Sequence, residues 1–324
     1  MNQYVFAAAS LPIMDSQPTF KGRWMDPMRR AVLVLLLIVG VGIGGRHAVL
    51  ADSYDFTVID VPESSYTGAY GINDRGEIVG ASYTDAYDSP GLHGFLLSQD
   101  AFTRIDGPAC SVPYSPDPQT LVYGINNLSQ AVGVSNPCGS ESHGFLWVDG
   151  ILTTFDIPGS PITEFHGIND RGQIVGYNSD AGGIPHGFLL SEGTVTELID
   201  PNSADVPIPF GINNRGDIVG SQGTHGFLLS GGRFTSIEVP GSRFTDVRGI
   251  NDRGQIVGFY LSVASQYHLF LYKDGKFTLI PLPEGSSPMA GGINNEGEIV
   301  GSYSDTRMNT HGFKLTPKEN SATQ

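Results

Sequence analysis

The segment GINDRGEIVG at residues 71–80 decides the fold, because the chain contains six versions of it. Each copy reads G-I-N-[D/N], three variable residues and [I/A]-V-G, and an H-x-F segment follows after a variable gap. The copies begin at Gly71, Gly124, Gly167, Gly211, Gly249 and Gly292, with successive spacings of 53, 43, 44, 38 and 43 residues. A period near 40 residues with strand-like content is typical of a repeat architecture.

Each copy divides into four short β-rich runs separated by turn residues. In the fourth copy these runs cover residues 210–213, 217–220, 225–229 and 234–239. No window shows a helical period. Five copies place glycine at one offset after G-I-N, which suits a tight hairpin, and the second copy has Ser129 there as the strained version. Pairs such as Asp149-Gly150 predict two-residue turns between the third and fourth runs.

The strand count at the two ends of the chain predicts a closed ring. The last copy stops after its third strand, at residues 311–315, while residues 56–62 read as a fourth strand with no copy before it. The sequence therefore predicts an all-β, six-bladed β-propeller over residues 52–315, with four antiparallel strands per blade. The last blade is closed by the N-terminal strand at residues 54–62, which leaves no open seam. Residues 316–324 are expected to form a polar C-terminal tail.

The expected core follows from alternation along the strands. In the first copy the residues that face neighbouring sheets should be Ile72, Val79, Phe95 and Ile105. Their equivalents recur in the other copies. The recurrent glycines at the same strands are expected to let neighbouring sheets approach closely.

The charge of the chain excludes two classes of partner. The formal net charge is −15, and residues 1–51 contribute five basic and only two acidic residues, so the remainder is more acidic still. Nucleic acid and anionic membrane both require a basic surface. We therefore expect neither as a partner of the mature protein.

Residues 1–51 are interpreted as an N-terminal extension plus a signal peptide. Arg29-Arg30 precede an uncharged run at residues 31–45, and small residues precede Asp52, which predicts cleavage after Ala51. The run is short for a membrane span, and an uncleaved anchor is the alternative. We expect a secreted, periplasmic or cell-surface protein. The chain has three candidate start residues, Met1, Met25 and Met28.

The only two cysteines, Cys110 and Cys138, are predicted to form a disulfide. Cys110 lies in a long insertion between the first and second copies, and Cys138 lies in the next loop that topology places on the same face. Two free thiols are the alternative.

The loops of this face vary in length, whereas the turns of the opposite face are short and uniform. Variable loops on a rigid scaffold are where binding usually occurs.

Six of the eight histidines occupy one slot, at the start of the third strand of each copy. They are His93, His143, His186, His225, His268 and His311. Neighbouring third strands of a propeller lie roughly 15 Å apart, too far for a shared metal ion. We interpret these imidazoles as scaffold groups that bond to turn backbone, and we predict no metal and no cofactor. The asparagine of each G-I-N is expected to cap its turn through its side chain.

The residue before each G-I-N is the candidate ligand-binding position, because the copies differ there. It enters the innermost strand near the mouth of the predicted channel. The residues that could stack on a sugar or hold an anionic group are Tyr70, Tyr123, His166, Phe210 and Arg248, and Gly291 completes the set. The alternative is that these rings only plug the channel.

No catalytic signature stands out in the chain. There is no G-x-S-x-G, H-E-x-x-H or C-x-x-C segment and no glycine-rich phosphate loop. Paired carboxylates could still act as acid and base on a polysaccharide or lactone, which leaves a hydrolase or lyase as an alternative. The candidates on the variable face are Asp85, Asp88, Glu164, Asp180 and Asp246.

The repeated G-I-N-x-x-G-x-I-V-G and H-G-F-L segments resemble the HAF-type extracellular repeat of exported bacterial proteins. The resemblance covers roughly residues 54–315. It implies export and a repeat scaffold, but it supplies no functional residue. We therefore expect an exported binding or scaffold propeller whose loop-rich face recognises a carbohydrate, a small molecule or a cell-envelope protein. A purely structural or adhesive surface protein is a further alternative.

Overall fold

The computed structural model describes residues 54–84, 91–108, 119–137, 141–283 and 286–318, all of which belong to one compact unit. The predicted signal peptide, its cleavage site, both cysteines and the carboxylates Asp85 and Asp88 lie outside the described residues. Within the described ranges every regular element is a strand, and no helix there is long and apolar enough to cross a membrane.

Each sequence copy forms strands where the pattern predicts them. The strands that end at the isoleucine of G-I-N, which we call the G-I-N strands, are β2 (Tyr66–Ile72), β6 (Gln119–Ile125), β10 (Ile162–Ile168), β14 (Pro207–Ile212), β18 (Ser242–Ile250) and β22 (Ser287–Ile293). The strands that begin at I-V-G or A-V-G are β3 (Ile78–Thr84), β7 (Ala131–Asn136), β11 (Ile174–Ser179), β15 (Ile218–Gln222), β19 (Ile256–Ser262) and β23 (Ile299–Ser304).

The histidine-containing strands and the outermost strands complete the set. The former are β4 (Gly91–Ser98), β8 (His143–Val148), β12 (Pro185–Ser191), β16 (His225–Ser230), β20 (Tyr267–Lys273) and β24 (Thr310–Pro317). The latter are β5 (Ala101–Ile105), β9 (Ile151–Phe155), β13 (Thr194–Glu197), β17 (Arg233–Ile237), β21 (Lys276–Ile280) and β1 (Tyr54–Ile59).

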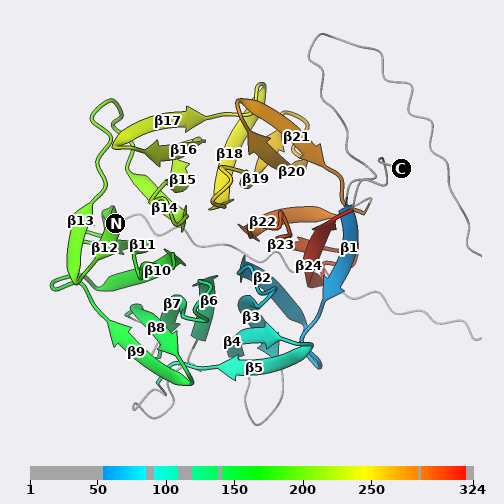
Figure 1. The fold of residues 1–324 in the computed structure, drawn as a ribbon, viewed down its shortest axis with the longest axis horizontal. Coiled ribbons are helices and arrows are strands. Elements are labelled where there is room, and N and C mark those ends of the chain that lie inside the picture. The colour runs from blue at the N-terminus through cyan, green and yellow to red at the C-terminus, as the bar shows by residue number, and fades with distance from the viewer. Residues whose placement is uncertain (1–53, 85–90, 109–118, 138–140, 284–285, 319–324) are drawn as a thin grey trace, which may run out of the picture. The chain divides into compact units, whose positions relative to one another are not determined.

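These strands pair into antiparallel sheets that are arranged in a ring (Figure 1), with the G-I-N strands innermost. Four sheets contain four strands each, from β6 to β21 in chain order. The other eight strands form one larger sheet, in which β22–β23–β24–β1 and β2–β3–β4–β5 are joined by a single parallel pairing, Tyr66 with Thr310. The fold is thus an all-β propeller-like ring.

The N-terminal strand pairs with the last histidine-containing strand, as the strand count predicts. β1 runs antiparallel to β24, with Phe56 opposite Leu315 and Ile59 opposite Gly312. The ring of Phe56 also stacks on Phe313 at a centroid distance of 5.9 Å. This pairing covers an edge of β24 that would otherwise be open to other chains.

The core lies between neighbouring sheets and consists of the residues that alternation predicts. Ile72, Val79, Phe95 and Ile105 are all buried, with exposed fractions of 7%, 0%, 2% and 2%. The valines of the six [I/A]-V-G segments and the phenylalanines of H-x-F are buried in every copy. Burial of six such sets, rather than one central core, holds adjacent sheets together.

The predicted turns have the expected backbone geometry. Asn73 Oδ1 accepts the backbone N–H groups of Arg75 and Glu77 at 3.0 Å each, which is the predicted cap. The second copy keeps the same turn without glycine, because Ser129 adopts a φ of 55°. The turn Asp149-Gly150 has positive φ at both residues, as a type I′ hairpin requires.

The capping asparagines also link neighbouring repeats, which the sequence did not predict. The side-chain amide of each donates to the backbone carbonyl of the equivalent asparagine in the next repeat over 2.9–3.1 Å. The sixth repeat bonds to the first through Asn294 and Asn73. The hydrogen bonds therefore form a closed cycle through all six repeats.

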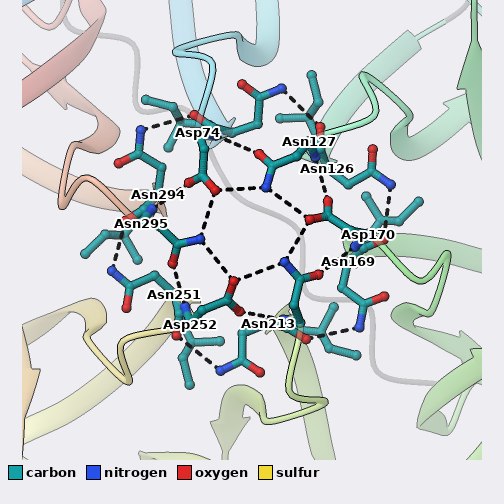
Figure 2. A pocket seen from close by; sticks show the side chains of 18 residues that line it. Asp74, Asn126, Asn127, Asn169, Asp170, Asn213, Asn251, Asp252, Asn294 and Asn295 are labelled. Carbon is teal, nitrogen blue, oxygen red and sulfur yellow. Dashed lines mark hydrogen bonds between the residues drawn. The ribbon is translucent and has the colours of Figure 1, made fainter.

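A second cycle lies beside the first, at the residue after each G-I-N (Figure 2). Aspartate and asparagine alternate there, in the order Asp74, Asn127, Asp170, Asn214, Asp252 and Asn295. Each asparagine amide donates to Oδ2 of both neighbouring aspartates over 2.8–3.1 Å. Each backbone N–H of the set donates to Oδ1 of the next member over 2.7–2.8 Å. Every carboxylate in this cycle accepts three hydrogen bonds.

The prediction that the slot histidines bond to turn backbone is wrong. Four of them bond through Nδ1 to a carboxylate on or just after the adjacent outermost strand, at 2.7–3.0 Å, because that strand places an acid beside the slot. The pairs are His93 with Asp106, His143 with Asp156, His186 with Glu197 and His311 with Asp60. The last pair joins the N-terminal segment to β24.

Candidate functional site

The predicted ligand-binding positions lie at β-bulges. In every innermost strand the pairing register shifts around the residue before G-I-N, for example between Ala69 and Gly71 and between Val122 and Gly124. The extra residue of a bulge is left out of the strand ladder, and bulges commonly redirect a side chain toward a site. The bulge residues are Tyr70, Tyr123, His166, Phe210, Arg248 and, with a second glycine, Gly291.

All six bulge positions line one cavity of about 410 Å³. We call it the mouth cavity. Its other described lining residues come from the same innermost strands and from their neighbours, and include Tyr66, Glu164 and Tyr177. Along each innermost strand the chain runs from the mouth cavity through glycine and isoleucine to the Asp/Asn cycle. The structure therefore brings together all five predicted site residues, at the end of the channel opposite that cycle.

Aromatic rings form a continuous arc around the mouth cavity. The rings of Tyr70 and Tyr123 have centroids 5.5 Å apart, and the imidazole of His166 meets Tyr123 edge-on at 5.1 Å. Phe210 stacks on the other side of His166 at 5.0 Å. The guanidinium of Arg248 lies over Phe210, 4.0 Å from the ring centroid. Contacts of this kind fix the rings in place and leave their exposed faces and edges for a ligand.

The positive charge of Arg248 is held by a buried carboxylate. Arg248 Nε lies 2.7 Å from Asp246 Oδ1, and Nη2 donates to Oδ2 at 3.0 Å. The side chain of Asp246 is only 6% exposed. Burial raises the pKa of Asp246, while the nearby Arg248 acts in the opposite direction. Only the Nη2 contact has hydrogen-bond geometry, and the opposite charges of the two groups offset each other in the cavity wall.

Glu164 lies two residues before His166 on β10, and its neighbours are a tyrosine and this histidine rather than an arginine. The hydroxyl of Tyr177 donates to Glu164 Oε1 at 3.0 Å, and His166 Nε2 lies 3.4 Å from Oε2. His166 Nδ1 lies 2.9 Å from the carbonyl oxygen of Pro209. Because a carbonyl can only accept, Nδ1 carries a proton, so Nε2 can donate to Glu164 only when the imidazole carries a second proton.

The tyrosine hydroxyls of the cavity stay protonated. Burial raises the pKa of Tyr70, and the adjacent Tyr66, whose hydroxyl oxygen lies 2.5 Å away, raises it further. Burial also raises the pKa of Tyr123 and Tyr177, with Glu164 adding to the effect in both. These groups are therefore hydrogen-bond donors, and their rings remain neutral at physiological pH.

The five candidate carboxylates do not assemble into an acid–base pair among the described residues. Glu164 lines the mouth cavity, and Asp246 is held by Arg248. Asp180 instead accepts the backbone N–H groups of Gly182 and Ile184 in an exposed turn. Within the described ranges no group of three or more His, Cys, Asp or Glu side chains could hold a metal ion.

Sequence reasoning missed Tyr66 and Tyr177 as cavity residues. Tyr66 lies four residues before its bulge and Tyr177 directly follows I-V-G, but tyrosine recurs at neither position in the other copies, so no repeat pattern singles them out. Tyr177 lies three residues after the start of β11 and pairs with Glu164 in the strand register. The signal that identifies both is their position on the strand relative to the bulge, which only the register reveals.

Comparison with solved structures shows the fold class of this chain. The Aleuria aurantia lectin in complex with Fucalpha1-6GlcNAc is similar, with 11% identity and a TM-score of 0.50 over 79% of this chain and 96% of the lectin. The β-propeller domain of the Trilobed protease from Pyrococcus furiosus has 10% identity and a TM-score of 0.45, and 85% of this chain and 97% of that chain are covered. The chain is a β-propeller-like protein.

A third similar structure is longer than the matched region. TolB from Acinetobacter baumannii has 14% identity and a TM-score of 0.48, with 75% of this chain covered. The chain spans 64% of the TolB chain. No protein-family model and no curated protein matches the sequence. The resemblance to HAF-type repeats therefore stays a prediction.

Proposed function

We propose that this protein is a six-bladed β-propeller that binds a small organic ligand in the mouth cavity. The observation that carries the proposal is that one structural device, a β-bulge in every innermost strand, directs six different residues into one cavity of about 410 Å³. A volume of this size is typical of small-molecule sites, as is a largely apolar wall with a few polar groups. A structural ring would not need the six positions to differ.

Two observations support the count of six blades. The eight-stranded sheet divides at its single parallel pairing into two sets of four antiparallel strands, and the four other sheets have four strands each. The asparagine hydrogen bonds pass through six repeats and return from Asn294 to Asn73. A ring with an open gap would interrupt that cycle.

The shape of the site favours a small ligand over a protein partner. A smaller space of about 90 Å³, lined by the glycines and isoleucines of the innermost strands, shares the bulge residues with the mouth cavity, and the Asp/Asn cycle lies at the other end of the channel. Ring faces, phenol hydroxyls and a carboxylate can satisfy a small polar molecule from several sides, whether a sugar or another ring-sized ligand. The hydrolase alternative lacks a second carboxylate beside Glu164 among the described residues.

Binding to this cavity can be tested with two substitutions that shorten the aromatic arc. A thermal-shift screen with sugars and small charged and neutral molecules should identify ligands that raise the unfolding midpoint. Tyr123→Ala and Phe210→Ala should each weaken the binding of those ligands by about fivefold or more, since stacking on a ring contributes about 1 kcal/mol or more. Ile151→Ala, at the exposed first residue of β9, is the control. Unchanged affinities in both variants would exclude the mouth cavity.

We also propose that the protein is exported and carries one disulfide, as the sequence predicts. The apolar run after Arg29-Arg30 supports export, and the oxidising compartment that export implies supports a Cys110–Cys138 bond. N-terminal sequencing of the mature protein should begin at Asp52. Mass spectrometry of the unreduced protein should find no alkylatable thiol, and two alkylated cysteines would refute the disulfide.

A further inference from the structure

The charges of the mouth cavity point to the chemical class of its ligand, and this inference rests on the proposed binding function. Arg248 is the only described lining residue with an ammonium or guanidinium group. Its Nε and Nη2 atoms are engaged by Asp246, and one face of the guanidinium is covered by Phe210. An anionic ligand would therefore compete with a buried carboxylate for a cation that is already neutralised.

Glu164 presents the opposite situation. It is a carboxylate on the cavity wall, 19% exposed, and its one good donor is the Tyr177 hydroxyl. His166 does not neutralise it while the imidazole is neutral, because the proton on Nδ1 faces the Pro209 carbonyl. When the Arg248–Asp246 charges offset each other and His166 is neutral, as at alkaline pH, the described lining of the cavity carries one net negative charge.

The aromatic arc adds a second feature that attracts positive charge. The faces of neutral aromatic rings carry negative electrostatic potential, and cations are held within about 6 Å of ring centroids. Tyr70, Tyr123 and Phe210 line the cavity together with the Tyr177 ring, which packs 5.6 Å from His166. Because burial keeps the phenols protonated, these rings attract a cation through their faces while adding no charge of their own.

We infer that the mouth cavity takes an organic cation, a small alkylated ammonium compound. Its charged head lies beside Glu164 and its alkyl groups contact the aromatic arc. A carboxylate next to several rings satisfies both parts of such a molecule, because the charge is paired and the carbon groups are removed from water. The net charge of −15 adds a weak long-range attraction for cations.

The test compares four probes in calorimetric titrations at pH 8.5, where a histidine imidazole is neutral. Choline is the cation, 3,3-dimethylbutan-1-ol is its neutral isostere, methyl glycosides represent neutral sugars, and propionate represents anions. We expect choline to bind at least tenfold more tightly than its isostere. Glu164→Gln should remove most of that difference, and Tyr123→Ala should weaken both probes.

The control variant is Glu238→Gln, which removes the same charge at an exposed residue just after β17. It should leave the preference for choline unchanged. If the isostere binds as well as choline, or if glycosides or propionate bind while choline does not, the cation inference is wrong and the binding function stands. If no probe of any class binds and the wider screen also finds no ligand, the binding function itself fails.

Discussion

At the scale of the residue, the alternating Asp/Asn cycle shows how polar groups can close a ring. An asparagine side chain has two amide protons and one carbonyl, whereas an ionised aspartate only accepts. In this order the amide of each asparagine donates one hydrogen bond to the aspartate on either side. Every carboxylate in turn accepts hydrogen bonds from both neighbouring asparagines. The cycle joins six repeats, and each of its three carboxylates accepts hydrogen bonds from two asparagine amides and one backbone N–H.

The alternation predicts a large effect from a small change. Asn127→Asp would place three aspartates in succession and remove two donors to charged groups, so we expect a loss of about 3 kcal/mol in the free energy of unfolding. Urea unfolding at pH 7 measures it. Asn202→Asp, at an exposed loop residue, introduces the same charge and should change stability by less than about 0.5 kcal/mol. Equal stability of the two variants would show that the cycle contributes little.

The sequence predicted the identity of the bulge residues but not the full site. A position that differs among otherwise uniform repeats can be recognised without a structure, and Tyr70, Tyr123 and Arg248 were found in this way. The charge balance could not be found, because it depends on which carboxylate reaches Arg248. Asp246 does so from the same strand, and the group that faces Glu164 is the imidazole of His166.

At the scale of the element, the innermost strands depend on glycine where they approach one another. A Cβ atom on Gly124 would lie 2.7 Å from the carbonyl oxygen of His166 and 3.1 Å from the Cα of Gly167, and both are backbone atoms of the next sheet. Backbone cannot rotate out of the way as a flexible side chain can. Because glycine has no side chain, this position sets the distance between neighbouring innermost strands.

Gly124→Ala should lower the free energy of unfolding by about 2 kcal/mol, because neighbouring sheets must separate to admit the methyl group. The comparison is Gly76→Ala, where φ is 75° and nothing lies within 4 Å of the added Cβ. That variant should cost about 1 kcal/mol through backbone strain alone. Ser129 already occupies the equivalent turn position, with a φ of 55°. Denaturant unfolding of both variants tests the order.

The histidine–carboxylate pairs predict a pH dependence with a definite sign. The hydrogen bond to Glu197 raises the pKa of His186, and Asp180 lies on its other side. The protonated imidazole therefore favours the folded state. This contribution is complete below the unfolded value of 6.5 and is lost as the pH rises through the folded value. His186→Ala should lower the unfolding midpoint more at pH 5.5 than at pH 8.5.

His268 provides the matched control, because burial lowers its pKa and it stacks on Tyr260. The neutral form then favours folding, and that contribution is lost as the pH falls. His268→Ala should therefore show the opposite trend, with the larger loss at pH 8.5. Thermal unfolding at the two pH values measures both variants. If both variants lost more stability at the same pH, the assigned partners of the two histidines would be contradicted.

At the scale of the whole molecule, the first and last strands, β1 and β24, pair with each other, and we call this contact the seam. β1 contributes six residues that pair with β24, and Phe56 meets Tyr303 at 5.7 Å as well as Phe313. His311 bonds to Asp60 at the end of the same segment. The ends of the chain are thus held by strand pairing, ring packing and one side-chain bond.

Phe56→Ala should loosen this seam and cost about 2 kcal/mol, less than the loss for a fully buried phenylalanine because Phe56 is half-buried. Hydrogen exchange should show faster exchange of the β24 amides while β16 stays protected. Val58→Ala is the control on the same strand, since Val58 is 45% exposed. Uniform loss of protection around the ring would indicate that the seam is no weaker than the rest.

Much of the architecture could be predicted because each repeat reports the same strands independently. The orphan segment at Phe56 and the missing fourth strand after residue 315 then specify how the ends meet. The partners of the slot histidines were predicted wrongly, because the acid on or just after the outermost strand lies at no constant offset from its histidine. Asp106 and Glu197 fill that role from different offsets, 13 and 11 residues after their histidines.

The Asp/Asn cycle also imposes a rule of parity on how such a ring can evolve. Two kinds of residue can alternate around a closed circle only if the circle has an even number of members. Gain or loss of a single repeat would bring two carboxylates or two amides together, with donors or acceptors left unmatched. The alternation therefore stays unbroken only when repeats are gained or lost in pairs, one with aspartate and one with asparagine.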